Sequence, residues 1–366
     1  MSEPPGPELC VVVPTFNEAG NVAVLVERLD AVLAGFDWEI VFVDDDSPDG
    51  TADRVREIGR TDRRVRCLRR MGRRGLSSAT IEGMLSTSAD FVAVMDGDLQ
   101  HDEGLLPRMV EFLRGGTVEL VSASRYVGAG DAGGLSSGSR RRLSRAGTNL
   151  ARLVVKSDVT DPVSGFFMLR RTVFEAVAPR LTGIGFKILI DILASAPMPL
   201  RTAELPYTFR ARHSGESKLD PFTALEYLLL LIEKRSGSIL PSRLLLFGLV
   251  GATGVVVNLA GLRVLLALGV GFTEGDIIAT VAAMVSNFFL NNILTYRDQR
   301  LTGWRVWTGL ISFMAVCAIG ALVNVAVARD LYDVTGIWWL AGIAGAIVGA
   351  LLNYGLTSFF TWGRRR

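Results

Sequence analysis

Two acidic clusters in this chain have residue types and a spacing that suit a divalent cation. The first is Val43–Thr51, with the sequence VDDDSPDGT, and the second is Met95–Gln100, with the sequence MDGDLQ. Each cluster directly follows a short apolar run, and a strand that ends in carboxylates places them at the sheet edge where α/β proteins bind ligands. Two carboxylates separated by one residue can share a hard cation, which in turn can neutralise a diphosphate. Solvated turns after strands are the alternative for either cluster alone.

The elements that would position these clusters alternate along the first part of the chain. Short apolar runs typical of buried strands in a mostly parallel sheet occur at residues 9–13, 39–43, 65–68, 91–95 and 120–123. Amphipathic stretches lie between them, for example Asn21–Leu33 and Gly104–Leu113. Repeated strand–helix units predict an open α/β sheet with helices on both faces.

Bulk composition predicts more than one structural unit and excludes some kinds of site. At 366 residues the chain exceeds one average domain. Its apolar excess, with 49% hydrophobic residues and a mean hydropathy of +0.34, is concentrated after about residue 220. The net charge of +2 does not call for a nucleic-acid partner. Three cysteines without CxxC spacing favour structural thiols, and only two histidines exclude a His-rich metal site.

Two segments fall outside the strand–helix pattern. Residues 1–8 have no basic start and no apolar core, so we expect a disordered tail, not a signal peptide, ahead of a cytosolic domain. The Gly/Ser-rich segment Val127–Ser139 contains a Gly-x-Gly-x-x-Gly pattern that superficially matches a dinucleotide fingerprint. No helix start follows this pattern, so we interpret the segment as a mobile active-site loop.

The second half of the chain is apolar enough to cross a membrane four times. The predicted spans are residues 244–268, 277–296, 306–328 and 337–360. Basic residues precede the first span, separate the second from the third and end the chain, whereas the loops at 269–276 and 329–336 are poor in them. The positive-inside rule therefore puts both termini in the cytoplasm. The stretch Asp220–Arg235, apolar with charged ends, predicts a helix lying in the membrane interface; a core helix of the soluble domain is the alternative.

The membrane half also indicates an internal duplication. Gly254-x-x-x-Asn258 with Arg263 recurs as Gly320-x-x-x-Asn324 with Arg329, and Asn291-x-x-Leu294-Thr295 recurs as Asn353-x-x-Leu356-Thr357. These matches predict a two-helix unit repeated in the same orientation, with chance similarity among apolar helices as the alternative. We expect the Asn residues in the spans to form interhelical hydrogen bonds.

Six motifs in order give the first part of the chain its resemblance to a known enzyme family. They are PTFNE at 14–18, VDDDSPDGT at 43–51, DGDLQH at 96–101, SRY at 124–126, DPVSGFF at 161–167 and RxxGxSK at 212–218. The first three resemble the inverting family 2 glycosyltransferases. The full set, over about residues 9–235, resembles dolichyl- or polyprenyl-phosphate mannose synthases. The four spans resemble a GtrA-like membrane domain, mainly in their number and placement.

This resemblance implies an α/β GT-A glycosyltransferase domain, with a mostly parallel sheet and helices on both faces, plus an all-α domain of four transmembrane helices. We divide the chain accordingly into a tail at 1–8, a cytosolic catalytic domain at 9–218, an interfacial linker at 219–240 and the GtrA-like domain at 241–366. The implied reaction transfers mannose from GDP-mannose to a polyprenyl (dolichyl-type) phosphate at the cytoplasmic membrane face. Inversion at the anomeric carbon would give a β-linked lipid-phosphate sugar.

The resemblance also implies roles for individual residues. Those implied to bind the nucleotide-sugar are Pro14, Phe16, Glu18, Val43, Asp45, Asp96, Gly97, Asp98, Gln100, Arg125, Lys187, Arg212 and Lys218. The implied ligands of Mg²⁺ or Mn²⁺ are Asp96, Asp98 and Gln100, oxygen donors that suit either ion. Those implied to act in catalysis are Asp98, Arg125, Arg212 and Lys218, and those implied to bind the acceptor phosphate are Arg125, Arg140 and Ser144. Asp45 is a natural acceptor for a guanine edge or a ribose hydroxyl.

A lipid phosphate is already an anion at neutral pH, so this reaction needs no strong general base. Metal and basic side chains would bring two anions together and stabilise the nucleoside diphosphate leaving group. Three other functions fit parts of the sequence: glucose transfer from UDP-glucose, a lipid-sugar translocase with a regulatory cytosolic domain, and a processive polysaccharide synthase. The intact Asp96-x-Asp98-x-Gln100 motif argues against a regulatory domain. The spans lack central charges, which argues against a proton-driven transporter, and no Gln/Arg-x-x-Arg-Trp motif of processive synthases follows the catalytic domain.

Overall fold

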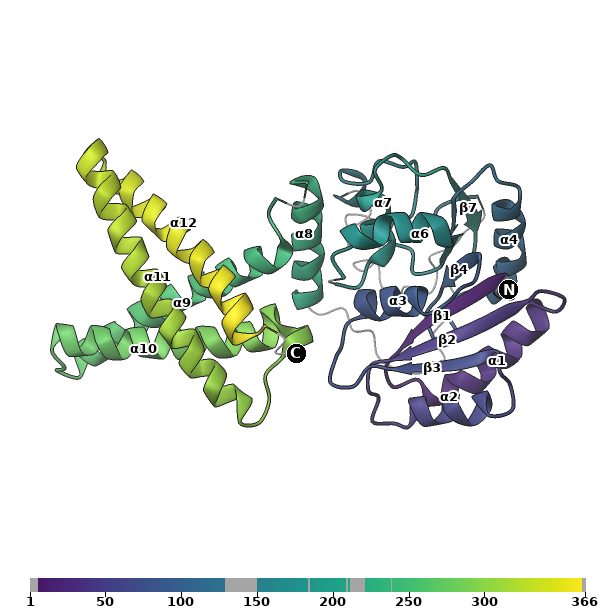
Figure 1. Ribbon diagram of the computed structural model, residues 1–366, viewed down its shortest axis with the longest axis horizontal. Helices are drawn as coiled ribbons and strands as arrows, with labels where there is room; N and C mark the ends of the chain where they lie inside the picture. The colour runs from purple at the N-terminus through teal and green to yellow at the C-terminus, as the bar shows by residue number, and fades with distance from the viewer. Residues whose placement is uncertain are drawn as a thin grey trace, which may run out of the picture. The chain divides into compact units, whose positions relative to one another are not determined.

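The computed structural model describes residues 6–128, 150–183, 185–208, 210, 221–237 and 239–363. The chain divides into two compact units, Met1–Ser238 and Ile239–Arg366. The first unit combines a sheet with helices, and the second consists of helices (Figure 1).

The first unit is built on a seven-stranded sheet with the strand order β3-β2-β1-β4-β6-β5-β7. Its strands are β1 (Leu9–Thr15), β2 (Trp38–Asp44), β3 (Val65–Arg69), β4 (Phe91–Val94), β5 (Leu120–Ser124), β6 (Phe167–Arg170) and β7 (Thr202–Pro206). β6 runs antiparallel to its neighbours β4 and β5, and the other pairs are parallel. The predicted mostly parallel α/β sheet is therefore confirmed, and its five predicted strands are β1 to β5. β6 and β7 were not predicted: β7, TAELP, is short of apolar side chains, and β6 has four residues, the same length as the predicted β4.

Helices cover both faces of this sheet (Figure 1). Alternate residues of β1 divide between two buried clusters, since successive strand side chains point to opposite faces. The cluster with Val11 includes helices α1 (Ala19–Val32), α2 (Thr51–Gly59) and α4 (Leu106–Arg114). The cluster with Val12 includes α3 (Leu76–Leu85), α6 (Arg171–Val177) and α7 (Ile188–Ser195). The short turns η1 (Glu103–Leu105) and η2 (Ala178–Arg180) and the helix α8 (Pro221–Arg235) complete the described elements of this unit.

The second unit contains four helices that are long and apolar enough to cross a membrane. Its elements are α9 (Ser242–Ala267), α10 (Phe272–Leu290), η3 (Asn291–Thr295), η4 (Arg297–Gln299), α11 (Arg305–Thr335), α12 (Trp338–Leu356) and η5 (Thr357–Thr361). Each predicted span coincides with one of these helices, and two of the helices extend beyond the predicted spans. α11 continues through the predicted loop at 329–335, because no helix-breaking residue occurs before Gly336, which ends the helix with a φ of 67°. α10 starts five residues earlier than predicted, directly after Gly271.

Contacts within the second unit repeat at a constant separation along the chain, 66 residues from Gly254 to Gly320. The side-chain amide of Asn287 fills the space beside Gly254 that a Cβ would need, and Asn353 does the same at Gly320. Asn353 therefore corresponds to Asn287, and the predicted correspondence with Asn291 was wrong. The error is four residues, about one helical turn, and a shift of one turn leaves a residue on nearly the same helix face.

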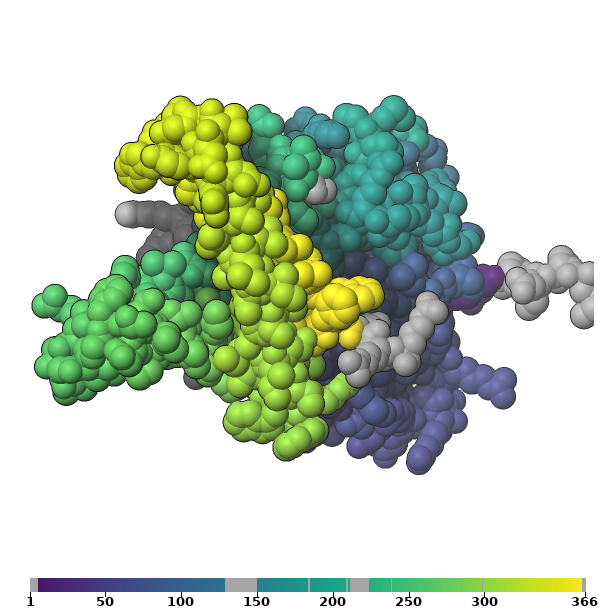
Figure 2. Space-filling view, turned by 60° about the vertical axis from the view of Figure 1, so that its left-hand side comes forward, coloured from purple at the N-terminus to yellow at the C-terminus, as the bar shows by residue number. Residues whose placement is uncertain are grey.

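The two helical hairpins also exchange equivalent contacts. Tyr296 shares a hydrogen bond of 2.6 Å between its Oη and Ser358 Oγ, and Trp362 Nε1 donates to Asn292 Oδ1 at 3.1 Å. Tyr296 and Trp362, which correspond in the two hairpins, stack with ring centroids 4.1 Å apart. Such reciprocal contacts are typical of an approximate twofold relation. Within each hairpin the two helices pack along their length, as Figure 2 shows for α11 and α12 in yellow-green and yellow. Within the first hairpin, an interhelical Asn bond of the predicted kind runs from Asn258 Nδ2 to Thr280 Oγ1 at 3.1 Å.

Candidate functional site

Three adjacent parallel strands, β2, β1 and β4, end in backbone turns that few residue types adopt. Asn17, Asp46 and Leu99 lie just beyond these strand ends and have φ values of 62°, 59° and 61°, respectively. Within the described residues, they are the non-glycine residues with positive φ. A positive φ is unfavourable for most residues other than glycine, and residues with such backbone conformations cluster at functional sites. The carboxyl edge of these strands is thus the candidate site, and it carries both acidic clusters.

The first acidic cluster organises the entry into α1. Asp44 accepts hydrogen bonds from the backbone N–H and the hydroxyl of Ser47. Backbone N–H groups at the start of α1 and just before it donate to side chains of the same loop. The N–H groups of Asn17, Glu18 and Ala19 donate to the side chains of Ser47, Thr51 and Asp49 at 2.9, 3.0 and 3.1 Å, respectively. Helix N-termini leave such donors unsatisfied unless a side chain accepts from them. These side chains therefore hold the loop in place instead of forming a shared cation site.

The predicted nucleotide-binding residues of β1 and β2 lie side by side at this edge, with Pro14 opposite Val43 in the sheet. The side chain of Val43 is fully buried in the core, so only its backbone can meet a ligand. Asp45 is tied into the fold: its Oδ1 accepts from Arg70 Nη1 and its Oδ2 from the Gly75 N–H, both at 2.7 Å. The predicted acceptor role of Asp45 would thus rely on the remaining lone pairs of these two oxygens.

Phe16 and Glu18 occupy the loop between β1 and α1. The guanidinium of Arg74 lies 4.3 Å from the centroid of the Phe16 ring, a cation–π contact. Glu18 Oε2 accepts from Asn21 Nδ2 at 2.6 Å, which fixes the carboxylate at the start of α1. Both predicted residues therefore lie at the same edge as Asp45.

The second acidic cluster follows β4 and is held by His101. The backbone N–H of Asp96 donates to His101 Nδ1 at 3.1 Å, which places the imidazole proton on Nε2, 3.7 Å from Asp96 Oδ2. Burial lowers the pKa of His101, so the ring is neutral at physiological pH. Asp98 Oδ1 accepts from the Gln100 N–H at 3.1 Å, and Gln100 Nε2 donates to the Arg210 carbonyl at 2.9 Å. Hydrogen bonds thus fix the motif at both ends, to His101 at Asp96 and to Arg210 at Gln100.

Two glycines let other segments approach this cluster closely. A Cβ on Gly165 would lie 3.1 Å from Asp96 Oδ2 and 3.4 Å from His101 Cε1. A Cβ on Gly97 would lie 3.2 Å from Thr15 Cγ2. The DPVSGFF segment and the end of β1 therefore touch the second cluster through positions with no room for a side chain.

Arg125, directly after β5, is paired with Asp161. Its Nε and Nη2 donate to Asp161 Oδ2 and Oδ1 at 2.8 and 3.0 Å, a bidentate geometry. Asp161 is fully buried and Arg125 is largely so. The predicted phosphate contact of Arg125 would use the guanidinium edge that faces away from Asp161.

Lys187 precedes α7 and donates from Nζ to the Val163 carbonyl at 3.0 Å. Burial, with a smaller contribution from the charge of Arg125, lowers the pKa of Lys187 to about 8. The charges of Asp96 and Asp161 act on Lys187 in the opposite sense, so these groups lie within electrostatic reach of one another. The structure thus brings Asp96, Arg125 and Lys187 together.

This pKa predicts a pH dependence for binding of an anionic substrate. Lys187 is protonated below about pH 8 and loses its positive charge as the pH rises through that value. We therefore expect kcat/KM for the nucleotide-sugar to fall about tenfold from pH 7 to pH 9, since kcat/KM reports the free enzyme. The Lys187→Arg variant, whose guanidinium stays charged, should show a flatter alkaline limb. An unchanged limb would contradict this role for Lys187.

The remaining predicted site residues, Arg140, Ser144, Arg212 and Lys218, lie outside the residues that the structure describes. Conversely, the structure adds His101, Asp161 and Gly165, whose positions in the site the sequence did not reveal. All three stand inside recognised motifs, which was the one available signal. Asp161 and Gly165 meet partners that are distant in sequence, whereas His101 meets Asp96 five residues away.

The second cluster fits a divalent cation of the kind that also binds a diphosphate. Asp96, Asp98 and Gln100 offer oxygen donors only, the set that Mg²⁺ and Mn²⁺ prefer. Among the described residues, no three His, Cys, Asp or Glu side chains converge to hold a metal by themselves. Mg²⁺ is usually bound by one or two carboxylates together with substrate phosphates and water, so the two carboxylates and the amide oxygen of this cluster would be sufficient protein ligands.

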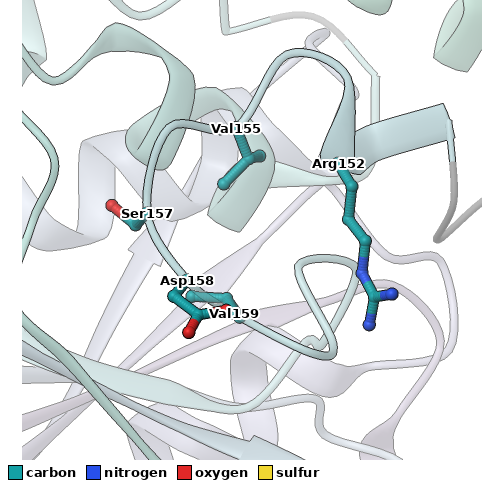
Figure 3. Close-up of a pocket in the computed structure, with 5 residues that line it drawn as sticks. All are labelled: Arg152, Val155, Ser157, Asp158 and Val159. Atoms are coloured by element: carbon teal, nitrogen blue, oxygen red, sulfur yellow. The ribbon is translucent and has the colours of Figure 1, made fainter.

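A hollow of about 330 Å³ elsewhere in the first unit is lined by Arg152, Val155, Ser157, Asp158 and Val159. Figure 3 shows that its lining comes from one short stretch of chain. None of the predicted site residues lines it. The candidate site is therefore the sheet edge, not this hollow.

Comparisons with known proteins found matches for both units of the chain. Residues 10–178 match glycosyl transferase family 2, and residues 246–362 match the GtrA/DPMS transmembrane domain. A dolichol-phosphate mannosyltransferase of Pyrococcus furiosus is 35% identical over 359 residues, 97% of this chain and 99% of the relative. Another from Saccharomyces cerevisiae is 34% identical over 230 residues, 60% of this chain and 84% of the relative. Among solved structures, glucosyl-3-phosphoglycerate synthase of Mycobacterium tuberculosis is 20% identical, with a TM-score of 0.45 over 63% of this chain and 81% of that one.

The near full-length match covers both units at once. The family 2 match contains both acidic clusters, Arg125 and Asp161, and the second match contains the four apolar helices. The protein is therefore a glycosyltransferase and an integral membrane protein, and it belongs to the dolichol-phosphate mannosyltransferase family.

Proposed function

We propose that this protein transfers mannose from GDP-mannose to a polyprenyl phosphate of the dolichyl type, with inversion, giving polyprenyl-phosphate β-mannose. The observation that carries this proposal is the pairing of carboxylates and cations at one sheet edge. Asp96 and Asp98 follow β4, Arg125 follows β5, and Lys187 precedes α7 within electrostatic reach of Asp96 and Arg125. A reaction between two anions needs both kinds of charge. The names of the relatives support mannose and a lipid phosphate as the reactants.

Each group has a distinct part in this mechanism. When bound, Mg²⁺ or Mn²⁺ at Asp96, Asp98 and Gln100 would supply positive charge to the diphosphate leaving group. His101 holds the backbone of Asp96 through Nδ1 and so orients that carboxylate. Arg125, oriented by Asp161, and Lys187 lower the electrostatic cost of bringing the lipid phosphate to the donor. Because the acceptor is already ionised, no side chain needs to remove a proton from it.

We also propose that the catalytic unit works at the cytoplasmic membrane face. Basic residues flank the spans on the side of both termini, as the positive-inside rule requires. α8 carries exposed Leu228 and Ile232, four residues apart on one helix face, and ends seven residues before α9 begins. This exposed apolar face of α8 would then lie in the interface of the bilayer. Residues 219–240 would form an interfacial linker. Transfer in inverted but not in right-side-out sealed vesicles would test this orientation.

The choice of donor is tested directly by kinetics. We expect the purified full-length protein, with a polyprenyl phosphate and Mg²⁺ or Mn²⁺, to use GDP-mannose at least about tenfold better than UDP-glucose in kcat/KM. A ratio of ten corresponds to about 1.4 kcal/mol of differential transition-state binding. Equal or reversed ratios would replace mannose by glucose in this proposal. Lipid-sugar movement without any transfer would instead favour a translocase.

A further inference from the structure

A buried ion pair anchors α8 to the catalytic unit. Lys234 Nζ lies 2.6 Å from Asp191 Oδ1 of α7, and the two side chains are only 4% and 1% exposed. Lys234 Nζ also donates to Ser195 Oγ at 2.7 Å and to the Arg180 carbonyl at 3.2 Å. All three ammonium donors of this lysine therefore have acceptors.

The second oxygen of Asp191 holds the segment that leads to Lys187. Asp191 Oδ2 accepts from the Thr182 N–H at 2.8 Å and from Thr182 Oγ1 at 2.7 Å. Gly183 and Gly185 follow with φ values of 64° and 79°, so this backbone can adopt conformations that other residues would resist. Asp191 thus fixes Thr182, the first residue of the segment that ends at Lys187, and the two glycines give that segment conformational freedom.

α8 touches the same segment at a second point. The Tyr227 ring lies 6.5 Å from the ring of Phe186, the residue before Lys187. Leu231 of α8 joins a buried cluster with Val163, whose carbonyl accepts from Lys187. α8 therefore acts on the start of the segment through Asp191 and on its end through Phe186. It also shares a buried cluster with Val163, whose carbonyl accepts from Lys187.

We propose that Lys234 and Asp191 are positioning residues for glycosyl transfer: they hold Thr182, and through it Lys187, in place for the anionic donor. Two features favour this role over simple stabilisation. A buried ion pair is weak evidence of stability, because well-packed apolar residues often serve as well. In addition, the pair connects a helix with an exposed apolar face to a candidate substrate-binding lysine. The inference rests on the proposed function, in which Lys187 faces the nucleotide-sugar.

The test is a double-mutant cycle on donor affinity in the full-length protein. GDP binding in the presence of Mg²⁺ is measured by calorimetry for wild type, Lys234→Met, Lys187→Met and the double variant. We expect Lys234→Met to weaken GDP binding about tenfold in the wild-type background, the factor given by a misplaced binding group. In the Lys187→Met background the same change should cost less than about twofold, since Lys234 acts through Lys187.

Three further variants keep the outcome decisive. Thr182→Val removes the hydroxyl that donates to Asp191 Oδ2, so it should weaken GDP binding in the wild-type background alone, even if Lys234→Met fails to fold. Val110→Ala, a buried change in α4 on the opposite face, controls for lost stability, and Lys156→Met controls for loss of an exposed lysine. Equal losses in both Lys187 backgrounds, or none, would overturn the positioning role. Wild-type preference for UDP over GDP would count against the proposed donor and not against this role.

Discussion

Asp98→Asn should reduce mannosyl transfer by about two to three orders of magnitude, the range expected when a group that stabilises transition-state charge is lost. The variant should remain folded, because the amide oxygen can still accept the hydrogen bond that the Gln100 N–H donates to Asp98 Oδ1. The amide has no charge, however, and is a poorer ligand for a hard cation. Steady-state kinetics at saturating Mn²⁺ measure the loss, and Mn²⁺ titration in the presence of GDP should show weaker metal binding.

Asp53→Asn is the matched control for this prediction. Asp53 is an exposed carboxylate in the first turn of α2, paired only with Arg56 among the ion pairs of the described chain. Its replacement should leave the rate within about twofold of wild type. EDTA should reproduce the Asp98→Asn loss in the wild-type protein. Full activity of the Asp98 variant in EDTA would rule out the metal assignment.

Asp161→Ala should lower the free energy of unfolding by about 3–5 kcal/mol, the usual cost of removing one partner of a buried ion pair. Asp161 is fully buried against Arg125, so the variant leaves the guanidinium charge without its bidentate partner. Thr160 and its neighbours would still be held by Glu204, which accepts from the Thr160 and Asp161 N–H groups. Denaturant unfolding of the detergent-solubilised protein, followed by tryptophan fluorescence, measures the change.

The double variant Arg125→Met/Asp161→Leu separates stability from function. Replacing both partners by apolar residues of similar size removes the uncompensated charge, so stability should return most of the way to the wild-type value. Transfer should remain strongly reduced, because the double variant lacks the guanidinium that we propose acts on the anionic substrates. If the double variant were as unstable as the sum of the single variants Arg125→Met and Asp161→Leu, the two side chains would not be coupled as the structure indicates. If it were fully active, Arg125 would have no part in catalysis.

The α/β class and five of the strands follow from the sequence because their signal is local. Continuous apolar runs mark strands buried on both faces, and β1, β2 and β4 have such runs, while β3 and β5 have interrupted ones. The same locality explains the four membrane spans, each an apolar stretch of sufficient length. β7 lacks a comparable local signal, and the short apolar β6 is identified as a strand by its hydrogen-bond partners in the sheet. β6 even runs against its neighbours, a direction that no short sequence pattern encodes.

The motifs located the candidate site in sequence, and the fold decided what each residue does there. Asp45 and Asp98 look alike as carboxylates after strands, yet the first is tied to Arg70 and the second lies beside Gln100. Arg125 acquires its buried partner Asp161 only when the chain folds back, since the two are far apart in sequence. Such long-range pairs leave no periodic trace, so only the tertiary structure reveals them.

In the membrane unit as well, the sequence indicated the repeat and the structure determined its register, which differs from the predicted one by one helical turn. The glycine and asparagine spacings were sufficient to indicate two similar hairpins, because both hairpins retain these residues. They did not determine the register of the second helix, since positions four residues apart share a helix face. The close contacts of Asn287 with Gly254 and of Asn353 with Gly320 determine it, because a side-chain amide fits only where the facing residue has no Cβ. Composition and periodicity thus determined which elements form, and packing between distant residues decided their register, their partners and the roles of the charged groups.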